Sequence, residues 1–276
     1  SALKILTSLV AQERFGPEYR FETHLFLDGR GNLYIKGFGD PLLTSEAVLD
    51  IGKKLVAMGI RQLRSIRLDD SAFDLQGETA SEENSAKSYD APNGALAVNF
   101  NAVSIMVAEK GTINPGEPET PLLPLMRQLG RGLAPGTHRL NINMLHSQPQ
   151  VSATLRYAGE LFTAQLQQAG IVIHHSWKIQ APPGNLQPIL VHRSRATLAE
   201  IVGECLKYSN NFIANQLFLA CGVQSQGLPA TWEKARLTFR DYATTTLGLS
   251  KDHLIMMEGA GLSRQTLATH RRWTGQ

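Results

Sequence analysis

The sequence predicts a mixed α/β protein in which one domain, contributed by both chain ends, is split by a large strand-rich inserted domain. Two observations carry this prediction. Helical periodicity gathers near the two ends of the chain, whereas short strands, loops and glycine–proline breaks fill the middle. We expect the split domain at residues 1–21 and 186–276, and the inserted domain at residues 22–185.

In the first half of the chain, helices are predicted from apolar residues every three or four positions, and strands from short apolar runs bounded by turn residues. A polar loop is expected over residues 75–88, because glycine, serine and glutamate replace the apolar residues there. The elements in order are a helix over 1–14, strands over 21–27 and 32–36, a helix over 45–58, a strand over 66–68, and one long or two short strands over 95–108.

In the second half, a proline- and glycine-rich connection over 111–124 leads into further strands and helices. Residues 181–185 resemble a boundary, because they combine two prolines with a glycine. The elements in order are strands over 139–145, 171–174 and 189–191, helices over 154–169, 197–207, 212–222 and 232–247, and a glycine-rich turn over 258–263.

Length and composition indicate a globular protein with a sizeable core. The chain has 276 residues, of which 42% are hydrophobic and 18% are charged. The net charge of +3 and the lack of a basic cluster interleaved with aromatics argue against nucleic-acid binding. No apolar run reaches the roughly 18 residues that a membrane span needs. A single pair of cysteines, Cys205 and Cys221, does not establish a disulfide, and two buried free thiols are expected.

A polar tripeptide, Ser209-Asn210-Asn211, stands between two of the predicted helices. The helix before it begins with a plausible capping box formed by Thr197 and Glu200. Buried amides and hydroxyls cost free energy unless they find partners. The tripeptide is therefore either a capped helix junction or part of a functional site, and local sequence leaves both interpretations open.

Ser1 and Lys4 form the only Ser-x-x-Lys of the chain, and Ser209 and Asn211 form its only Ser-x-Asn. Residues three apart on a helix lie on one face, one turn apart. A lysine on a buried face is partly desolvated, so its pKa falls and its neutral form can act as a base on the serine. A second serine with a nearby asparagine can pass that proton to a leaving amine and hold a substrate amide. Alternatively, Ser1 is incidental and Lys4 is a solvated helix residue.

In these two motifs the sequence resembles the penicillin-binding proteins. The resemblance is to their class C low-molecular-mass branch, the D-alanyl-D-alanine carboxypeptidases and endopeptidases of the DacB type (peptidase family S13), and it covers essentially the whole chain. The run Leu206-Lys207-Tyr208-Ser209-Asn210-Asn211-Phe212 is its strongest single feature. Further similar stretches follow in the family's order, at residues 37–42, 68–73, 89–92, 95–101 and 258–264.

The resemblance implies a penicillin-binding/β-lactamase-like serine transferase fold and residue roles. Ser1 would be the acylated nucleophile, Lys4 its general base and Ser209 the proton relay, while Asn211 would bind the substrate amide. The implied partners are peptidoglycan stem peptides ending in D-Ala-D-Ala, and β-lactams would acylate the same serine. No cofactor or metal is implied. The location would be the periplasm, reached by export, although no signal peptide is present in this sequence. Class A β-lactamases have no insertion of this size, so antibiotic hydrolysis is disfavoured.

The third motif of the family, Lys-Thr-Gly, is absent from the sequence. Trp273-Thr274-Gly275 is similar but lacks the cation. We therefore expect a chain truncated at both ends and, as it stands, inactive. Glu258 and Ala260 replace the aspartate and serine that are usual in the family, without affecting a catalytic role. An alternative to the enzyme is a non-catalytic, peptidoglycan-binding relative that lacks the third motif.

Overall fold

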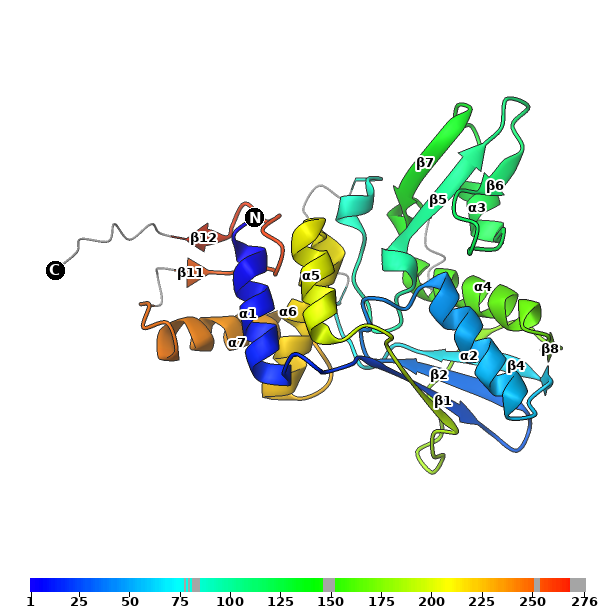
Figure 1. Cartoon of the computed structure of the whole chain (residues 1–276), viewed down its shortest axis with the longest axis horizontal. Helices are drawn as coiled ribbons and strands as arrows, with labels where there is room; N and C mark the ends of the chain where they lie inside the picture. Colours follow the sequence, from blue (N-terminus) through cyan, green and yellow to red (C-terminus); the bar gives the residue numbers. More distant parts are fainter. Residues whose placement is uncertain (77, 79, 81–84, 146–151, 251–253, 269–276) are drawn as a thin grey trace.

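The computed structural model describes residues 1–76, 78, 80, 85–145, 152–250 and 254–268 (Figure 1). It is a mixed α/β protein, as the sequence predicts. Helices and strands alternate through the first half of the described chain, and three helices follow one another near its end. The helices are α1 (Leu3–Phe15), α2 (Ser45–Ala57), α3 (Pro124–Leu129), α4 (Ala153–Gln168), α5 (Leu198–Lys207), α6 (Asn211–Gln226) and α7 (Trp232–Thr245), with short 3-10 turns η1 (Ser88–Asp90), η2 (Asn99–Asn101) and η3 (Ile142–Met144).

A five-stranded mixed sheet forms the centre of the middle segment, in the order β10-β1-β2-β4-β9. Strand β1 is antiparallel to both β10 and β2, whereas β4 runs parallel to both β2 and β9. Helix α2 makes the crossover between β2 and β4 that a parallel pair requires. The five strands are β1 (Glu22–Leu27), β2 (Asn32–Gly37), β4 (Ser65–Asp69), β9 (Lys178–Ile179) and β10 (Leu190–Arg193).

A smaller three-stranded antiparallel sheet, β6-β5-β7, projects away from the central sheet (Figure 1). Two further two-stranded pairs complete the described strands, β3 with β8 and β11 with β12. The strands are β5 (Ala102–Val107), β6 (Ile113–Pro115), β7 (Gly136–Asn141), β3 (Gln62–Leu63), β8 (Val172–Ile173), β11 (Leu254–Ile255) and β12 (Leu267–Ala268).

The apolar side chains form two large buried clusters. One lies under α2 and α4 and draws its buried members from residues 25–171. The other joins α1, α5, α6 and α7 and draws its buried members from residues 10–21 and 198–260. The division into a split and an inserted domain stays a prediction. Because β10 pairs with β1, with Leu190 opposite Leu25, we propose that the second boundary falls after Arg193 rather than near residue 186.

Two sequence predictions need correction. Only residues 102–107 of the expected strand region 95–108 form a strand. The turn before it holds Asn99, Phe100 and Asn101 at φ values of 47°, 60° and 49°. Hydrogen bonds of a buried side chain take the place of strand pairing in this turn. Asn99 Nδ2 donates to Ser45 Oγ at 2.8 Å and to Tyr157 Oη at 2.9 Å.

The second correction concerns the end of α6. The helix does not stop at Gly222 but continues to Gln226, and Gly227 terminates it with a φ of 77°. Gly222 instead allows close packing of α6 on α7, because a Cβ atom there would lie 2.8 Å from the backbone nitrogen of Ala235. A glycine that sequence periodicity assigns to a helix end thus serves a helix crossing.

Replacing Gly222 by alanine tests this packing. We expect Gly222→Ala to lower the free energy of unfolding by about 1–3 kcal/mol, because the added methyl group overpacks a backbone contact. Gly203→Ala is the matched control, since Gly203 is helical and exposed and a Cβ there meets nothing within 4 Å. The control should be neutral or up to about 1 kcal/mol more stable. Urea denaturation measures both, and equal effects at the two positions would contradict the assignment.

Candidate active site

Ser1 and Lys4 lie at the start of α1. No side chain caps this helix from its N-cap residue Ala2, but Ser1 Oγ accepts a hydrogen bond from the Leu3 backbone nitrogen at 3.2 Å. Ser1 is exposed, whereas Lys4 is only 4% exposed. An accessible hydroxyl therefore stands one helical turn from a buried amine.

The Lys4 side chain has the environment that a lysine base requires. Its Nζ donates to the backbone oxygen of Ala260 at 3.0 Å. Burial lowers the pKa of Lys4 below its ordinary value of 10.5, against the opposing influence of nearby Cys205 and Glu258. The prediction of a desolvated lysine is thus confirmed, and the alternative of a solvated one is wrong.

The turn between α5 and α6 carries the Ser-Asn-Asn tripeptide. The predicted capping box is present at the start of α5, between Thr197 and Glu200. Asn210 caps α6, because its Oδ1 accepts from the Ile213 nitrogen at 3.1 Å. The helix-junction interpretation is therefore correct for Asn210, and it leaves the side chains of Ser209 and Asn211 available for other roles.

Ser209 and Asn211 flank this cap in different ways. Ser209 is exposed and adopts a φ of 50°, a left-handed conformation that costs a non-glycine residue about 1 kcal/mol or more. Asn211 is half-buried, and its Nδ2 donates to the backbone oxygen of Tyr89 at 3.2 Å. No described residue bonds the side-chain oxygen of Asn211, so an acceptor is available at the start of α6.

Cys205 of α5 interacts both with Lys4 and with the tripeptide turn. This buried thiol is close enough to Lys4 for each to influence the pKa of the other, and its Sγ donates to the backbone oxygen of Asn210 at 3.6 Å. Lys4 is therefore a neighbour of the tripeptide turn. Within the described chain no hydrogen bond joins Ser209 to Ser1 or Lys4, so the structure does not bond these predicted site residues to one another.

Glu258 is a structural anchor that sequence reasoning missed. It is 1% exposed, and its carboxylate accepts hydrogen bonds from the backbone nitrogens of Ala260, Gly261 and Leu262 at 2.8, 2.6 and 2.8 Å. This fixes the turn whose Ala260 oxygen holds Lys4. The available signal was an acidic residue directly before Gly-x-Gly, which as a buried group requires several donors.

The same turn is pinned to two helices and to Ser1. Thr7 Oγ1 of α1 donates to the Gly259 oxygen at 2.8 Å, and the Gly259 nitrogen donates to Asn215 Oδ1 of α6 at 2.7 Å. Gly261, at a φ of 79°, packs directly against Ser1, so that a Cβ atom there would collide with the Ser1 side chain. The turn thus positions both Ser1 and Lys4.

The side-chain amides of Asn93 and Gln216, which sequence reasoning also missed, attach the segment before η2 to the start of α6. Asn93 Nδ2 donates to the Phe212 oxygen at 3.1 Å and to Gln216 Oε1 at 3.0 Å. Gln216 Nε2 returns a bond to the Gly94 oxygen at 3.0 Å. Both amides are buried, so residues 93 and 94 hold the helix turn that carries Asn211.

Other sequence predictions have mixed outcomes. Cys205 and Cys221 are free and buried, as expected. In the described ranges, no three His, Cys, Asp or Glu side chains gather as a metal site would require. None of the helices in the described part of the chain has the length and apolar character needed to cross a bilayer. Trp273-Thr274-Gly275 falls outside the described residues.

Comparison with known proteins gives consistent matches. The model of the D-Ala-D-Ala carboxypeptidase 3 (S13) family matches residues 1–129 and 140–274. A D-alanyl-D-alanine carboxypeptidase from Actinomadura sp. (strain R39) is 26% identical over 311 residues, covering 98% of this chain and 57% of the relative. The chain thus spans little more than half the length of that relative.

Solved structures share the fold. The crystal structure of penicillin-binding protein 4 (dacB) from Haemophilus influenzae matches with a TM-score of 0.77 at 21% identity, covering 97% of this chain and 66% of that one. The structure of the same protein complexed with a novel β-lactam gives a TM-score of 0.69, also at 21% identity, covering 97% and 65% of the two chains. The predicted fold class is therefore confirmed.

Replacing Glu258 by glutamine tests the anchor. We expect Glu258→Gln to lower the free energy of unfolding by about 2–4 kcal/mol. The NH2 group of the glutamine amide is a donor, and in this buried site it would face backbone N–H groups that are donors too. The control is Glu109→Gln, at an exposed position, which should change stability by no more than about 0.5 kcal/mol. Chemical denaturation followed by circular dichroism measures both. A loss for Glu258→Gln no larger than the control's would show that the carboxylate is not needed.

Proposed function

Because the chain belongs to the D-Ala-D-Ala carboxypeptidase (S13) family, we propose that it is a serine-type D-Ala-D-Ala carboxypeptidase whose acyl-enzyme forms on Ser1. One observation carries the proposal. The exposed Ser1 hydroxyl lies one helical turn from Lys4, a buried amine whose pKa is lowered by burial. A nucleophile beside a base of lowered pKa is the arrangement that acyl transfer needs.

In the first step, the neutral amine of Lys4 takes the proton of the Ser1 hydroxyl while Oγ bonds to the carbonyl carbon of the penultimate D-alanine. The bond from Lys4 Nζ to the Ala260 oxygen uses one N–H and orients the amine. The nitrogen lone pair is then free to accept the serine proton. The result is a tetrahedral intermediate and a protonated Lys4.

In the second step, the proton passes from Lys4 through the Ser209 hydroxyl to the nitrogen of the terminal D-alanine. The carbon–nitrogen bond breaks, D-alanine leaves as a free amine, and an ester remains on Ser1. Asn211 holds the substrate amide through its unbonded side-chain oxygen at the start of α6. Water then attacks the ester, and Ser1 and Lys4 recover their starting states.

The substrate class that we propose is peptidoglycan stem peptides ending in D-Ala-D-Ala, with cross-links cut by the same chemistry in an endopeptidase reaction. β-Lactams would acylate Ser1, since their strained amide carbonyl meets the same nucleophile. The H. influenzae relative forms a complex with a β-lactam, which supports this proposal. Peptidoglycan lies outside the cytoplasm, so we propose a periplasmic location.

A second candidate is a peptidoglycan-binding relative without catalysis. The observation that favours it is the absence of a Lys-Thr-Gly tripeptide from the 276 residues. The reading frame on either side of these residues decides between the two. A Lys-Thr-Gly or His-Thr-Gly encoded there favours the enzyme, and its absence favours the binding protein.

Labelling with a fluorescent penicillin tests the nucleophile, using protein expressed from the whole reading frame. We expect covalent label on the peptide that contains Ser1, and its loss in Ser1→Ala. Ser8→Ala is a control on the same helix, since the Ser8 hydroxyl is buried without a hydrogen-bond partner among the described residues. Label that persists in Ser1→Ala would overturn the assignment.

The pH dependence of acylation tests Lys4. A base works only when neutral, so the acylation rate should rise with pH through the pKa of Lys4, with a midpoint below the ordinary 10.5 because burial lowers it. Lys4→Arg should be slower by about 10²- to 10⁴-fold and lose this rise, because a guanidinium stays charged. Stopped-flow acylation measures both. The control is Lys53→Arg at an exposed position, and a Lys4→Arg rate equal to the control's would exclude the role.

A further inference from the structure

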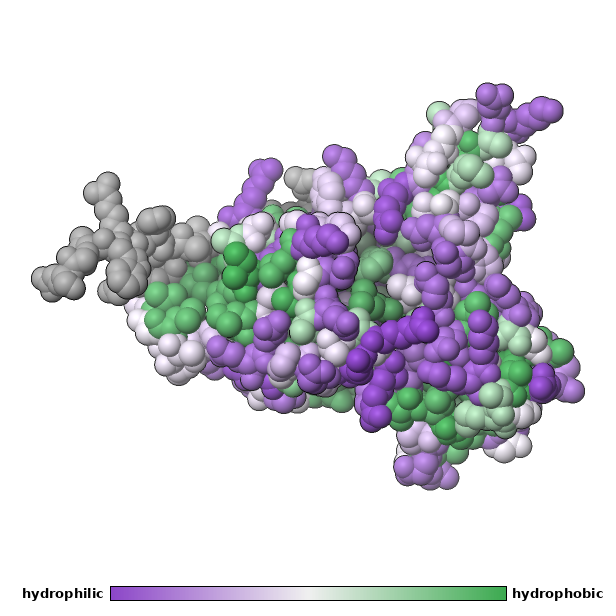
Figure 2. Space-filling view, in the orientation of Figure 1, coloured by the Kyte–Doolittle hydropathy of each residue, from purple (hydrophilic) through white to green (hydrophobic). Residues whose placement is uncertain are grey.

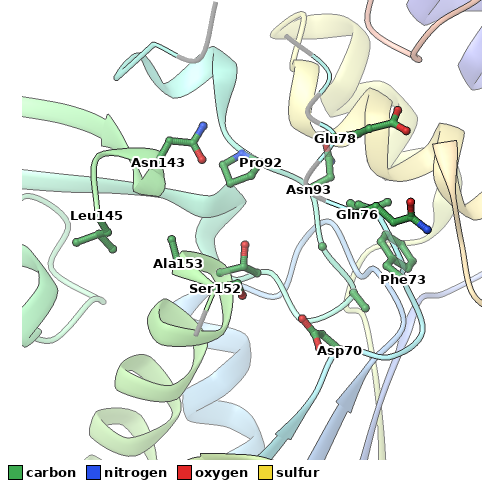
Figure 3. Close-up of a pocket in the computed structure, with 14 residues that line it drawn as sticks. Asp70, Phe73, Gln76, Glu78, Pro92, Asn93, Asn143, Leu145, Ser152 and Ala153 are labelled. Carbon is green, nitrogen blue, oxygen red and sulfur yellow. The ribbon is translucent and has the colours of Figure 1, made fainter. Parts of the chain in front are cut away.

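The structure contains a cavity of about 450 Å³ (Figure 3). Its walls come from the loop after β4, residues 92–95, the end of η3 and the first turn of α4. Cavities of roughly 300–1,000 Å³ are the usual size of small-molecule sites. None of the four residues proposed for catalysis lines it.

The charged side chains of the lining are both acidic. Glu78 already pairs with Arg236 at 2.9 Å. Asp70 forms no ion pair with a described residue, and burial, together with the neighbouring Asp69 carboxylate, raises its pKa. Among the described residues of the lining there is no Lys, Arg or His, so an anionic ligand would find no counter-charge on them.

Several uncharged groups around Asp70 can each make a further hydrogen bond. Asn143 Nδ2 donates to the backbone oxygen of Asp90 at 3.2 Å, which leaves the side-chain oxygen of Asn143 as an acceptor. Ser152 Oγ accepts from the Leu155 nitrogen at 3.1 Å, which leaves its hydroxyl proton to donate. A donor and acceptors from separate segments of the chain thus line one cavity (Figure 3).

Apolar surface separates these polar groups. Phe73 contributes a ring on one side, and Leu145 and Ala153 lie on the other (Figure 3). A ligand matched to this lining is uncharged, carries several hydroxyl or amide groups, and has apolar faces between them. An N-acetylated sugar has these properties. An ammonium group would use Asp70 alone and leave the uncharged partners unmatched.

The cavity is separated from the proposed active site by one segment of chain. Asn93 belongs to its wall and also bonds the Phe212 oxygen, next to Asn211. Tyr89, in the same segment, accepts from Asn211 itself. A stem peptide of peptidoglycan is attached to a sugar of the glycan strand. A site for that sugar must therefore lie no farther from the active site than one stem peptide can span.

We propose that this cavity binds an N-acetylated sugar of the glycan strand that carries the stem peptide. This inference rests on the proposed function, because it takes peptidoglycan as the substrate. Asp70 accepts sugar hydroxyls in a charge-assisted hydrogen bond, Asn143 and Ser152 bond further polar groups, and the apolar residues cover the ring and the acetamido methyl.

A titration with di-N-acetylchitobiose tests the site, using nitrogen-15-labelled protein expressed from the whole reading frame. We expect saturable shifts of the backbone amide signals of Gly94, Asn143 and Thr154. Asp70→Ala should weaken binding about tenfold or more, the usual effect of losing a hydrogen bond to a charged group. Ala153→Trp should abolish binding by filling the cavity. Ser71→Ala, next to Asp70 but outside the lining, should leave the affinity unchanged.

Three outcomes would overturn the proposal. The first is the absence of any shift at sugar concentrations well above a millimolar Kd. The second is that Asp70→Ala and Ala153→Trp bind the sugar as tightly as the unsubstituted protein does. The third is that only an amine probe, such as Nα-acetyl-L-lysyl-D-alanine, causes shifts. Penicillin labelling of the same preparation separates the two proposals. Labelled protein without sugar shifts defeats the sugar site alone, whereas sugar shifts in unlabelled protein support the sugar site and defeat the acyl-enzyme.

Discussion

The buried carboxylate of Glu258 is the interaction on which the candidate site depends. A charge taken out of water needs several hydrogen-bond donors, and here backbone N–H groups of the following residues supply them. The turn that results is rigid and aims the Ala260 oxygen at Lys4. Without the charge, nothing in this loop would hold its N–H groups inward. The hydrogen-bond partner of Lys4 is therefore held in place by a residue more than 250 positions away.

The other side of the site depends on contact between two apolar cores. Asn93 donates to Gln216, Gln216 donates to the backbone oxygen of Gly94, and the backbone oxygen of Tyr89 accepts from Asn211. Buried amides of this kind are costly unless fully paired, so they specify one docking geometry. The middle segment orients the start of α6, and it supplies the wall shared with the cavity (Figure 3).

The arrangement of the molecule brings these contacts together. α1, α5 and α6 lie side by side near one end, and the central sheet lies at the other (Figure 1). Apolar surface is exposed around α1, and the surface over the sheet mixes hydrophilic and hydrophobic residues (Figure 2). Ile5 and Leu9 of α1 are 62% and 43% exposed, although their helix carries the proposed nucleophile. The site therefore lies on a helix with one face buried and one face open.

Local sequence was enough to determine α1, the β1–β2 hairpin and the capping box at Thr197. Each depends on residues within a few positions, where periodicity, caps and turn residues act directly. The full length of α6, the buried turn at residues 99–101, the anchor at Glu258 and the Asn93–Gln216 pair were decided by tertiary structure. These features depend on which distant backbone groups meet a buried polar atom or a missing Cβ, and no local pattern contains that information.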